Sequence, residues 1–285
     1  MKRLVRGAIE RTVRGAFGVD VYPDAFERLA VLDHASRLNG LFQHKLPDEL
    51  SRHPLLFIHV PKNGGTSLKR ALYAFDPGHA TLRYYDWLAP ALRPSKTSFA
   101  LLREPTDRFL SGYDFLRNGG GSDVSIQPAA LRRLAGIGTV DAYLDHLESL
   151  DGNWFGVDSF ARPQWWYVAD RAGVVAVDHL WIIGEQALEI AALLGRHDLP
   201  APRHVNRTRR EQRTLTAGQA ARVERLFHTD FLLYDAVSRT PGAGRKRWPR
   251  SPSRKCHRAR LEVPFPDPAA RDDPYLVQSR ARGRP

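Results

Sequence analysis

The chain has 285 residues, 42% of them hydrophobic, and its formal net charge is +12. This length and apolar content allow one large domain or two small ones with a substantial core. The longest apolar runs are too short to cross a bilayer, and the single cysteine, Cys256, excludes an internal disulfide and a cysteine-based metal site. The histidines show no close ligand spacing, so we expect no metal, and we expect a reducing, cytoplasmic setting.

Most of the positive charge lies at the end of the chain. Residues 241–285 contain twelve Lys or Arg against four Asp or Glu, and so account for +8 of the total. Arg, Lys, Pro, Ser and Gly dominate this segment, which cannot bury enough apolar surface to offset the entropy of ordering it. We predict a basic disordered tail over 241–285, a principal domain over 53–240 and an N-terminal helical arm over 1–52.

The charge distribution bears on two kinds of partner. Residues 1–20 are basic with apolar residues roughly on one side, so this part could contact a membrane surface or form a plain basic helix. The tail could attract nucleic acid, but no helix-turn-helix, RRM or zinc-finger pattern is present, and we do not expect nucleic acid as a partner. The small positive excess elsewhere suits a small anionic ligand better.

The stretch over 55–73, LLFIHVPKNGGTSLKRALY, is the most informative part of the sequence. Its first six residues are apolar apart from one histidine, which predicts a short buried strand that Pro61 ends. The Asn-Gly-Gly sequence that follows predicts a tight turn with positive φ. The hydroxyls of Thr66 and Ser67 suit the N-terminus of the next helix.

A strand, a glycine turn and a helix N-terminus together favour the binding of an anion. Backbone N–H groups converge at such a turn, and the positive end of the helix dipole points there. Lys62 adds a mobile positive charge. The pattern differs from the common NTPase loop, in which Lys follows the second glycine, because Lys62 precedes Gly64 and Gly65.

A second informative stretch, LLREPTDRFLSGY, spans 101–113. It overlaps a predicted buried strand over 98–103 and a predicted helix over 106–116. Ligands of parallel sheets bind at the carboxyl ends of strands, so Arg103 is expected at the same edge as the Lys62 turn. With the hydroxyl of Ser111 facing back towards the strand end, this guanidinium could bind a second phosphate.

The rest of the chain alternates between helical and strand patterns. Helices are predicted over 24–38, 129–134, 139–150, 185–195 and 216–239, and an arginine-rich loop over 197–212. Residues 174–177 and 180–183 are predicted to form two short strands or one strand with a bend. This alternation predicts an α/β domain with a mainly parallel central sheet flanked by helices.

Together, HVPKNGGTSL and LLREPTDRFLSGY resemble motifs of the PAPS-dependent sulfotransferases. They are most similar to the Golgi carbohydrate enzymes, including the heparan sulfate and uronyl 2-O-sulfotransferases, and to their bacterial relatives. Weaker similarities, such as ARPQWWY and LWIIGEQALE, extend the resemblance over about residues 53–237. Asn63 stands where Thr is commoner in the family. Since the Golgi members carry an N-terminal membrane anchor and none is visible here, the bacterial relatives fit the expected cytoplasmic setting better.

The resemblance implies a three-layer, P-loop-like sulfotransferase fold. It also implies transfer of a sulfuryl group from 3′-phosphoadenylyl sulfate (PAPS) to a hydroxyl acceptor, expected to be a carbohydrate. In such enzymes the first motif holds the 5′-phosphosulfate of the donor and the second holds its 3′-phosphate. The donor-binding residues implied here are Lys62, Asn63, Gly64, Gly65, Thr66, Ser67, Arg103 and Ser111.

Two residues are expected to act in catalysis. Lys62 is placed to neutralise the leaving phosphate, because lysine is a mobile point charge. A hydroxyl acceptor needs a general base of near-neutral pKa, and His79 lies between the two motifs, where the family has its base. Glu104, directly after Arg103, is the alternative base.

Four residues are candidates for the acceptor side. Arg83 and Arg117 are chosen for their charge, Gln164 for hydrogen bonding to sugar hydroxyls, and Trp165 for stacking on a sugar ring, with core packing as its alternative. Two other functions remain open. A P-loop-type kinase or NTPase is disfavoured by the missing Gly-Lys-Ser/Thr sequence, and a non-catalytic nucleotide or nucleic-acid binding protein would depend on the basic tail.

Overall fold

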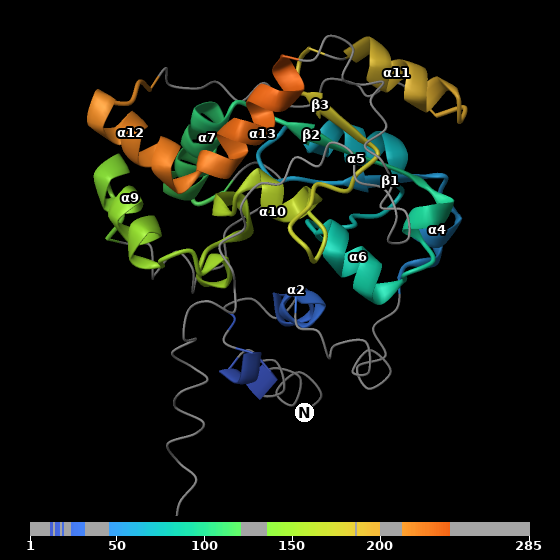
Figure 1. Cartoon of the computed structure of the whole chain (residues 1–285), viewed down its shortest axis with the longest axis horizontal. Helices are drawn as coiled ribbons and strands as arrows, with labels where there is room; N and C mark the ends of the chain where they lie inside the picture. Colours follow the sequence, from blue (N-terminus) through green and yellow to red (C-terminus); the bar gives the residue numbers. More distant parts are fainter. Residues whose placement is uncertain are drawn as a thin grey trace, which may run out of the picture.

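The structure is a computed structural model that describes residues 12–13, 15–17, 19, 24–31, 46–120, 136–185, 187–199 and 213–239. The predicted tail, the predicted helix over 129–134, most of the arginine-rich loop and most of the first twenty residues lie outside this set. Within it, three strands form one sheet that is surrounded by helices (Figure 1).

The sheet is parallel, with the strand order β1 (Leu55–Ile58), β2 (Thr97–Leu102) and β3 (His179–Ile182). The last pair between β1 and β2 joins Ile58 to Ala100, so β2 continues for two residues beyond the end of β1. Apart from the first residues of β2 and β3, every strand residue is buried. Near-continuous burial is typical of parallel strands that are covered on both faces. The predicted α/β class with a parallel sheet is therefore confirmed.

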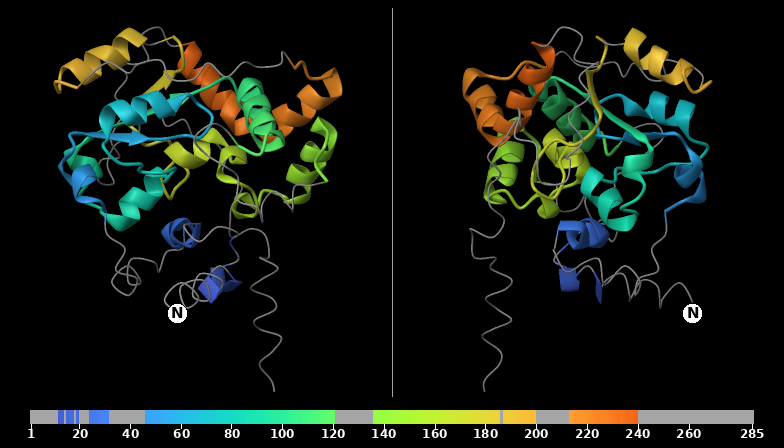
Figure 2. Two further views of the ribbon diagram at one scale, coloured as in Figure 1. Left: turned by 180° about the vertical axis from the view of Figure 1, so that it is seen from behind. Right: turned by 45° about the vertical axis from the view of Figure 1, so that its right-hand side comes forward.

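Helices lie on both sides of this sheet. In the left view of Figure 2, α5 lies above β1, α11 lies at the top of the molecule and α6 lies below β1. The helices are α2 (Asp24–Val31), α4 (Asp48–Arg52), α5 (Gly65–Leu72), α6 (Leu82–Leu88), α7 (Pro105–Arg117), α9 (Val140–Ser149), α10 (Gln164–Val168), α11 (Ala187–Gly195), α12 (Ala217–Leu226) and α13 (His228–Ser238). Short 3₁₀ turns cover Arg93–Ser95, Trp154–Gly156 and Ser159–Ala161.

Helix α2 is part of the same core as the sheet. Its apolar residues are buried apart from the half-buried Val31, and it packs against α6. Arg162 donates hydrogen bonds of 2.9 and 2.5 Å to the two carboxylate oxygens of Asp24. Glu27 accepts bonds of 2.8 and 2.6 Å from the backbone N–H and the hydroxyl of Thr81. A buried charge needs a counter-charge and a buried polar group needs hydrogen bonds, so the ion pair of Asp24 and the hydrogen bonds of Glu27 anchor α2 together with its apolar contacts.

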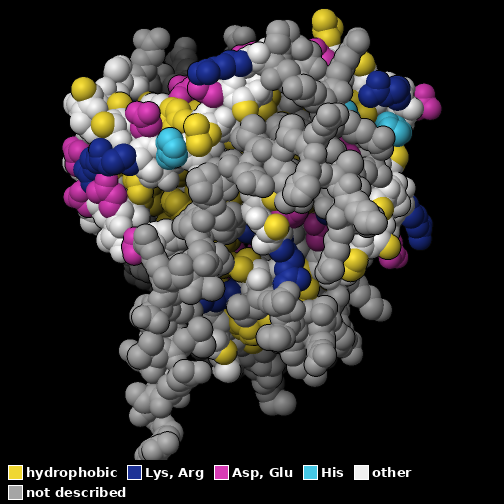
Figure 3. Space-filling view, viewed as in Figure 1, with side chains coloured by type: hydrophobic (Ala, Val, Ile, Leu, Met, Phe, Trp, Pro, Cys, Tyr) yellow, Lys and Arg dark blue, Asp and Glu magenta, His cyan; other side chains and the backbone are white. Residues whose placement is uncertain are grey.

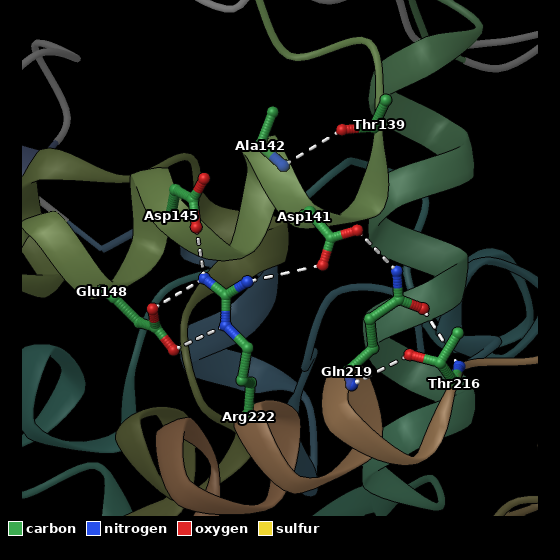
Figure 4. Close-up of polar contacts among 8 residues, drawn as sticks. All are labelled: Thr139, Asp141, Ala142, Asp145, Glu148, Thr216, Gln219 and Arg222. Atoms are coloured by element: carbon green, nitrogen blue, oxygen red, sulfur yellow. Dashed lines mark hydrogen bonds and ion pairs between the residues drawn. The ribbon is translucent and has the colours of Figure 1, made fainter.

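One arginine joins α12 to α9. Arg222 contacts Asp145 at 2.5 Å, Glu148 at 3.0 and 2.7 Å, and Asp141 at 3.5 Å, while Gln219 donates a 2.9 Å bond to Asp141 (Figure 4). The three carboxylates lie on one face of α9 because they are spaced by four and three residues. Arg222 offsets their mutual repulsion and fixes the two helices to each other.

Two predicted elements differ in the structure. The single helix over 216–239 is broken at Phe227, which has φ −112° and ψ 25°. The break turns the Phe227 ring into the core, where it lies 6.2 Å from the ring of Phe109 and 6.0 Å from that of Trp154. The strand over 174–177 is also absent, because Val175 forms only an isolated bridge with Ala169.

Candidate anion-binding site

The turn after β1 has an unusual backbone. Lys62 and Gly64 both have left-handed conformations, with φ of 68° and 67°, and α5 begins directly afterwards at Gly65. A left-handed residue followed by helical residues turns successive N–H groups to one side, which is the geometry of anion-binding nests. For a residue with a side chain, the left-handed region costs on the order of 1–3 kcal/mol, and such strain is concentrated at functional sites.

Both glycines of the turn are required by their surroundings. A Cβ atom at Gly64 would overlap the side chain of Ile183, which follows β3. A Cβ atom at Gly65 would overlap the ring of His59 and lie 3.0 Å from Cζ of Phe57. The first amides of α5 therefore lie close to the ends of β1 and β3, and glycine is the residue that allows this approach.

The first turn of α5 has no acidic side chain and no side-chain cap. The first N–H groups of a helix have no partners within it, so they can bind an anion there, and the helix dipole favours negative charge. Thr66 and Ser67 follow directly and are half-buried. The predicted start of the helix was at these two residues, but Gly64 occupies the cap position. The hydroxyls consequently lie inside the first turn.

The structure brings Lys62 and Arg103 together. Arg103 follows β2 directly, and its guanidinium donates a 3.0 Å hydrogen bond to the backbone carbonyl of Lys62. The Lys62 ammonium lies over the ring of Phe115, 3.9 Å from its centroid. Phe115 belongs to α7, the helix that starts just after Arg103. Two cationic side chains thus lie at the carboxyl ends of neighbouring parallel strands.

Ser111 lies on the same side of α7 as Asp107, which the Arg103 side chain also contacts. The guanidinium of Arg103 is 3.7 Å from the carboxylate of Asp107, and Ser111 is four residues after Asp107 in the helix. Residues four apart in a helix share a face, so Ser111 lies one turn further along the face of α7 that carries Asp107, the residue that Arg103 contacts. Ser111 is half-buried, and only 15% of the Arg103 side chain is exposed.

Asn63 and Gln164 fix this arrangement from the inside. Nδ2 of Asn63 donates to the carbonyl of Leu101 at 2.6 Å and to Oε1 of Gln164 at 2.7 Å. Since β1 ends at Ile58, this part of β2 is paired only with β3, and Asn63 supplies a hydrogen-bond donor on the side that β1 has left. Gln164 also binds the backbone of Arg103, through bonds of 2.9 Å from its N–H and 2.8 Å to its carbonyl.

Asn63 was predicted to bind the donor and Gln164 to contact the acceptor. Their side chains are 1% and 0% exposed, respectively, and they contact each other instead. Two further candidates for the acceptor are also buried. Arg83 is 2% exposed, donates to the Trp166 carbonyl at 2.8 Å and stacks on the Trp166 ring, and Trp165 is 6% exposed. The structure gives no support to acceptor contacts by these three side chains. Arg117, the last residue of α7, is exposed.

The sequence did not single out Arg108 as a residue of this site. Its Nε donates a 3.1 Å bond to the carbonyl of Pro61, and its side chain is buried in the first turn of α7. Burial lowers the pKa of this guanidinium, while the charge of Asp230 works in the opposite direction. Arg103 and Arg108 therefore hold two consecutive carbonyls of the same turn. The arginines of REPTDR are spaced by five residues, which is the only signal that sequence reasoning could have used.

His79 lies beside the strand that leads to the turn. Its Nδ1 is 3.0 Å from the carbonyl of His59, and the two rings are 4.3 Å apart. A carbonyl oxygen only accepts hydrogen bonds, so Nδ1 of His79 carries a proton and Nε2 of the neutral ring has the lone pair. Because the His59 ring also lies against Gly65, His79 is separated from the start of α5 by one side chain.

The surroundings of His79 favour the neutral imidazole. Although part of the residue is exposed at the surface, the protein removes water from around the ring, and this desolvation lowers the pKa of His79 from its usual value. The hydrogen bond to the His59 carbonyl has the opposite effect and raises the pKa. Glu104, the alternative base, has another role. Its carboxylate accepts a 2.6 Å bond from the N–H of Asp107 and caps the N-terminus of α7.

The structure shows an α/β domain in which a glycine turn and a helix N-terminus, a geometry that suits an anion, lie at the carboxyl edge of the sheet. Residues 50–119, which include β1, the turn, β2 and α7, match a family model described as "Sulfotransferase family". A search of the curated proteins found no match. The family match and the small parallel sheet are consistent with a P-loop-like sulfotransferase fold, and they support a sulfotransferase domain in this part of the chain.

Three observations limit what else the described residues can form. None of their helices is long and apolar enough to span a membrane. In the same parts of the chain, no group of three or more His, Cys, Asp or Glu residues could hold a metal ion. On the described part of the face in Figure 3, basic and acidic side chains are mixed rather than separated.

Proposed function

We propose that this chain is a PAPS-dependent sulfotransferase that acts on a hydroxyl group of a carbohydrate. The observation that carries the proposal is the contact between Arg103 and the carbonyl of Lys62, within the segment that matches the sulfotransferase family. Lys62 follows β1 and Arg103 follows β2, and two cationic side chains at separate positions suit PAPS, which has anionic groups at both its 5′ and 3′ positions.

The two ends of the donor have different partners. The amides from Gly64 to Ser67 and the positive end of α5 hold the 5′-phosphate, and the glycine backbone allows the phosphate to approach closely. Arg103 and Ser111 hold the 3′-phosphate, for which a guanidinium and a hydroxyl are suitable donors. The 3′-phosphate distinguishes PAPS from ATP and from adenylyl sulfate.

The transfer step needs a base, an in-line attack and stabilisation of the leaving group. Nε2 of His79 takes the proton from the acceptor hydroxyl, whose oxygen forms a bond to sulfur while the bond between sulfur and the 5′-phosphate oxygen breaks. The products are a sulfate ester, adenosine 3′,5′-bisphosphate (PAP) and protonated His79. Lys62 leaves its position over Phe115 and neutralises the charge that develops on the 5′-phosphate.

The carbohydrate acceptor rests on the resemblance to the 2-O-sulfotransferases, which continues beyond the second motif through residues 111–119, SGYDFLRNG. Within this segment, Arg117 is exposed at the end of α7, and we propose that it contacts an acidic sugar. An exposed arginine could bind a carboxylate or a sulfate on such an acceptor.

Transfer of labelled sulfate tests the proposal directly. The full chain is incubated with ³⁵S-labelled PAPS and a panel of acidic and neutral glycans, with and without EDTA. We expect label in a glycan fraction, with the same yield when EDTA is present. A parallel incubation uses γ-³²P-ATP, and magnesium-dependent transfer of ³²P to a glycan would indicate a kinase instead. If neither ³⁵S nor ³²P is transferred to any glycan, the proposed activity is contradicted.

A further inference from the structure

The side chain of Gln164 joins the two arms of the candidate site. It lies at the start of α10, is 0% exposed and belongs to none of the strands whose ends form the site. On one side it contacts Asn63 of the turn after β1, and on the other it contacts the backbone of Arg103 after β2. Arg103 and Asn63 are 61 and 101 residues, respectively, from Gln164 in the chain.

The hydrogen bonds allow only one orientation of the Gln164 amide. Oε1 accepts from Nδ2 of Asn63 at 2.7 Å and from the N–H of Arg103 at 2.9 Å, and both of these groups are donors. Nε2 donates to the carbonyl of Arg103 at 2.8 Å. A flipped amide would place donor against donor and acceptor against acceptor. The side chain therefore holds both backbone groups of Arg103 at fixed positions relative to the turn.

Asp230 fixes Gln164 in turn. Its carboxylate accepts a 2.7 Å bond from the N–H of Gln164 and a 2.9 Å bond from that of Trp165, and so it satisfies the first amides of α10. Asp230 lies on α13 and is 1% exposed, and burial raises the pKa of its carboxyl group to about 6, although the charge of Arg108 opposes this shift. The position of Gln164 is thus set by the helix that closes the described part of the chain.

We propose that Gln164 is a positioning residue that sets the spacing between the Lys62 turn and Arg103, and thereby the preference for a nucleotide with both a 5′- and a 3′-phosphate. The inference rests on the proposed function. Gln164 does not touch the donor in this account. It acts through Asn63, which holds the turn, and through the main chain of Arg103.

The test compares two ligands that differ only at the 3′ position. Affinities for PAP and for 5′-AMP are measured by calorimetry on the full chain, on Gln164→Glu and on Gln164→Met. Glutamate keeps an acceptor for Asn63 and for the Arg103 N–H but places a second oxygen against the Arg103 carbonyl. We expect each variant to lose about tenfold or more of the PAP-to-AMP affinity ratio, with a smaller change for AMP.

A matched control separates positioning from stability. Ser98 is 0% exposed at the start of β2, away from the site, and its hydroxyl donates a 2.9 Å bond to Asp178 and accepts a 3.0 Å bond from the Asp178 N–H. Ser98→Ala should lower the melting temperature as a Gln164 variant does, but should leave the PAP-to-AMP ratio unchanged. If neither Gln164 variant folds, Asn63→Ser removes the link from the other side and is expected to lower the same ratio.

The outcomes are distinct. An unchanged ratio in folded Gln164 variants, with PAP binding by the wild-type chain, overturns this inference and leaves the proposed function intact. A ratio that falls equally in Ser98→Ala shows a general effect of stability and overturns it as well. Failure of the wild-type chain to bind PAP overturns the proposed function and this inference together.

Discussion

The guanidinium of Arg103 donates a 3.0 Å hydrogen bond to the backbone carbonyl of Lys62, a residue 41 positions earlier in the chain. The two residues follow neighbouring parallel strands, and the carboxyl ends of such strands meet at one edge of the sheet. The contact gives Arg103 two roles. It supports the left-handed turn that contains Lys62, and its guanidinium also lies 3.7 Å from the carboxylate of Asp107, one helical turn before Ser111 in α7.

Removal of the Arg103 side chain should weaken binding of the 3′-phosphate. For Arg103→Ala we expect the affinity for PAP to fall by about 10–100-fold, because a hydrogen bond to a charged group contributes about 1.5–3 kcal/mol. Binding of 5′-AMP should change much less. Calorimetry with both ligands measures the difference. Arg93→Ala is the control, because Arg93 pairs with Asp86 elsewhere, and an equal loss of PAP affinity in both variants would contradict the assignment.

Lys62→Ala should separate turnover from binding. We expect kcat to fall by about 10²–10³-fold, the usual effect of removing one group that stabilises developing charge, while PAP affinity stays within a few-fold. Lys62→Arg keeps the charge and should recover part of the rate. Sulfate transfer under saturating PAPS measures kcat. Wild-type turnover in the alanine variant would show that the leaving group is neutralised by another residue.

Activity should depend on the protonation of His79. The protein around the ring lowers its pKa, so the neutral base is present at pH 7 and is lost as the pH falls through a value below the usual 6.5. A profile of kcat/KM against pH should therefore rise to a plateau with a midpoint below about 6.5.

His79→Asn keeps an N–H that can donate to the His59 carbonyl but removes the base. We expect it to abolish the pH-dependent rate while PAP binding stays near normal. Glu104→Gln serves as the comparison, since its side-chain oxygen can still cap α7. Loss of activity in the glutamine variant together with full activity in His79→Asn would move the base to Glu104.

Gly65→Ala should damage the anion site through a steric effect. The added Cβ would overlap the His59 ring, so either the ring or the first turn of α5 must move. We expect PAP affinity to fall by at least about tenfold, since phosphate binding needs the amides in place. Gly218→Ala is the control, because a Cβ there meets nothing within 4 Å in α12. Unaltered PAP binding by Gly65→Ala would contradict the proposed cradle.

Asp24→Asn tests whether α2 is an integral part of the domain. Removal of one partner from a buried ion pair leaves Arg162 without its counter-charge and should cost about 3–5 kcal/mol of unfolding free energy. Urea unfolding followed by circular dichroism gives the value. Asp235→Asn removes an exposed partner of Arg239 and should change stability by less than about 0.5 kcal/mol. Similar small effects in both variants would mean that α2 packs only loosely.

The local parts of the site could be predicted from the sequence. The strand before Pro61, the glycine turn and the helix after it are encoded by adjacent residues, and the structure has β1, the turn and α5 in this order. The neighbouring position of Arg103 followed from the rule that parallel strands end at one edge. The exact start of α5 at Gly65 could not be predicted, because the cap is the left-handed Gly64 rather than a hydroxyl side chain.

Contacts over long sequence distances could not be predicted. Gln164 was expected to face an acceptor, since a glutamine beside tryptophans gives no sign that its partners are Asn63 and Arg103. The cap that Asp230 provides for α10 could not be predicted either, because Asp230 is 66 residues from Gln164 in the chain. Likewise, nothing in the helical pattern over 216–239 marks Phe227, whose ring is drawn into the core by residues elsewhere in the chain.

A crystal structure of the full chain with PAP would test the central claim most directly. We expect the 5′-phosphate within hydrogen-bond distance of the amides from Gly64 to Ser67, and the 3′-phosphate on the guanidinium of Arg103 and the hydroxyl of Ser111. A PAP molecule bound with neither phosphate at the turn, or with its 3′-phosphate away from Arg103, would contradict it.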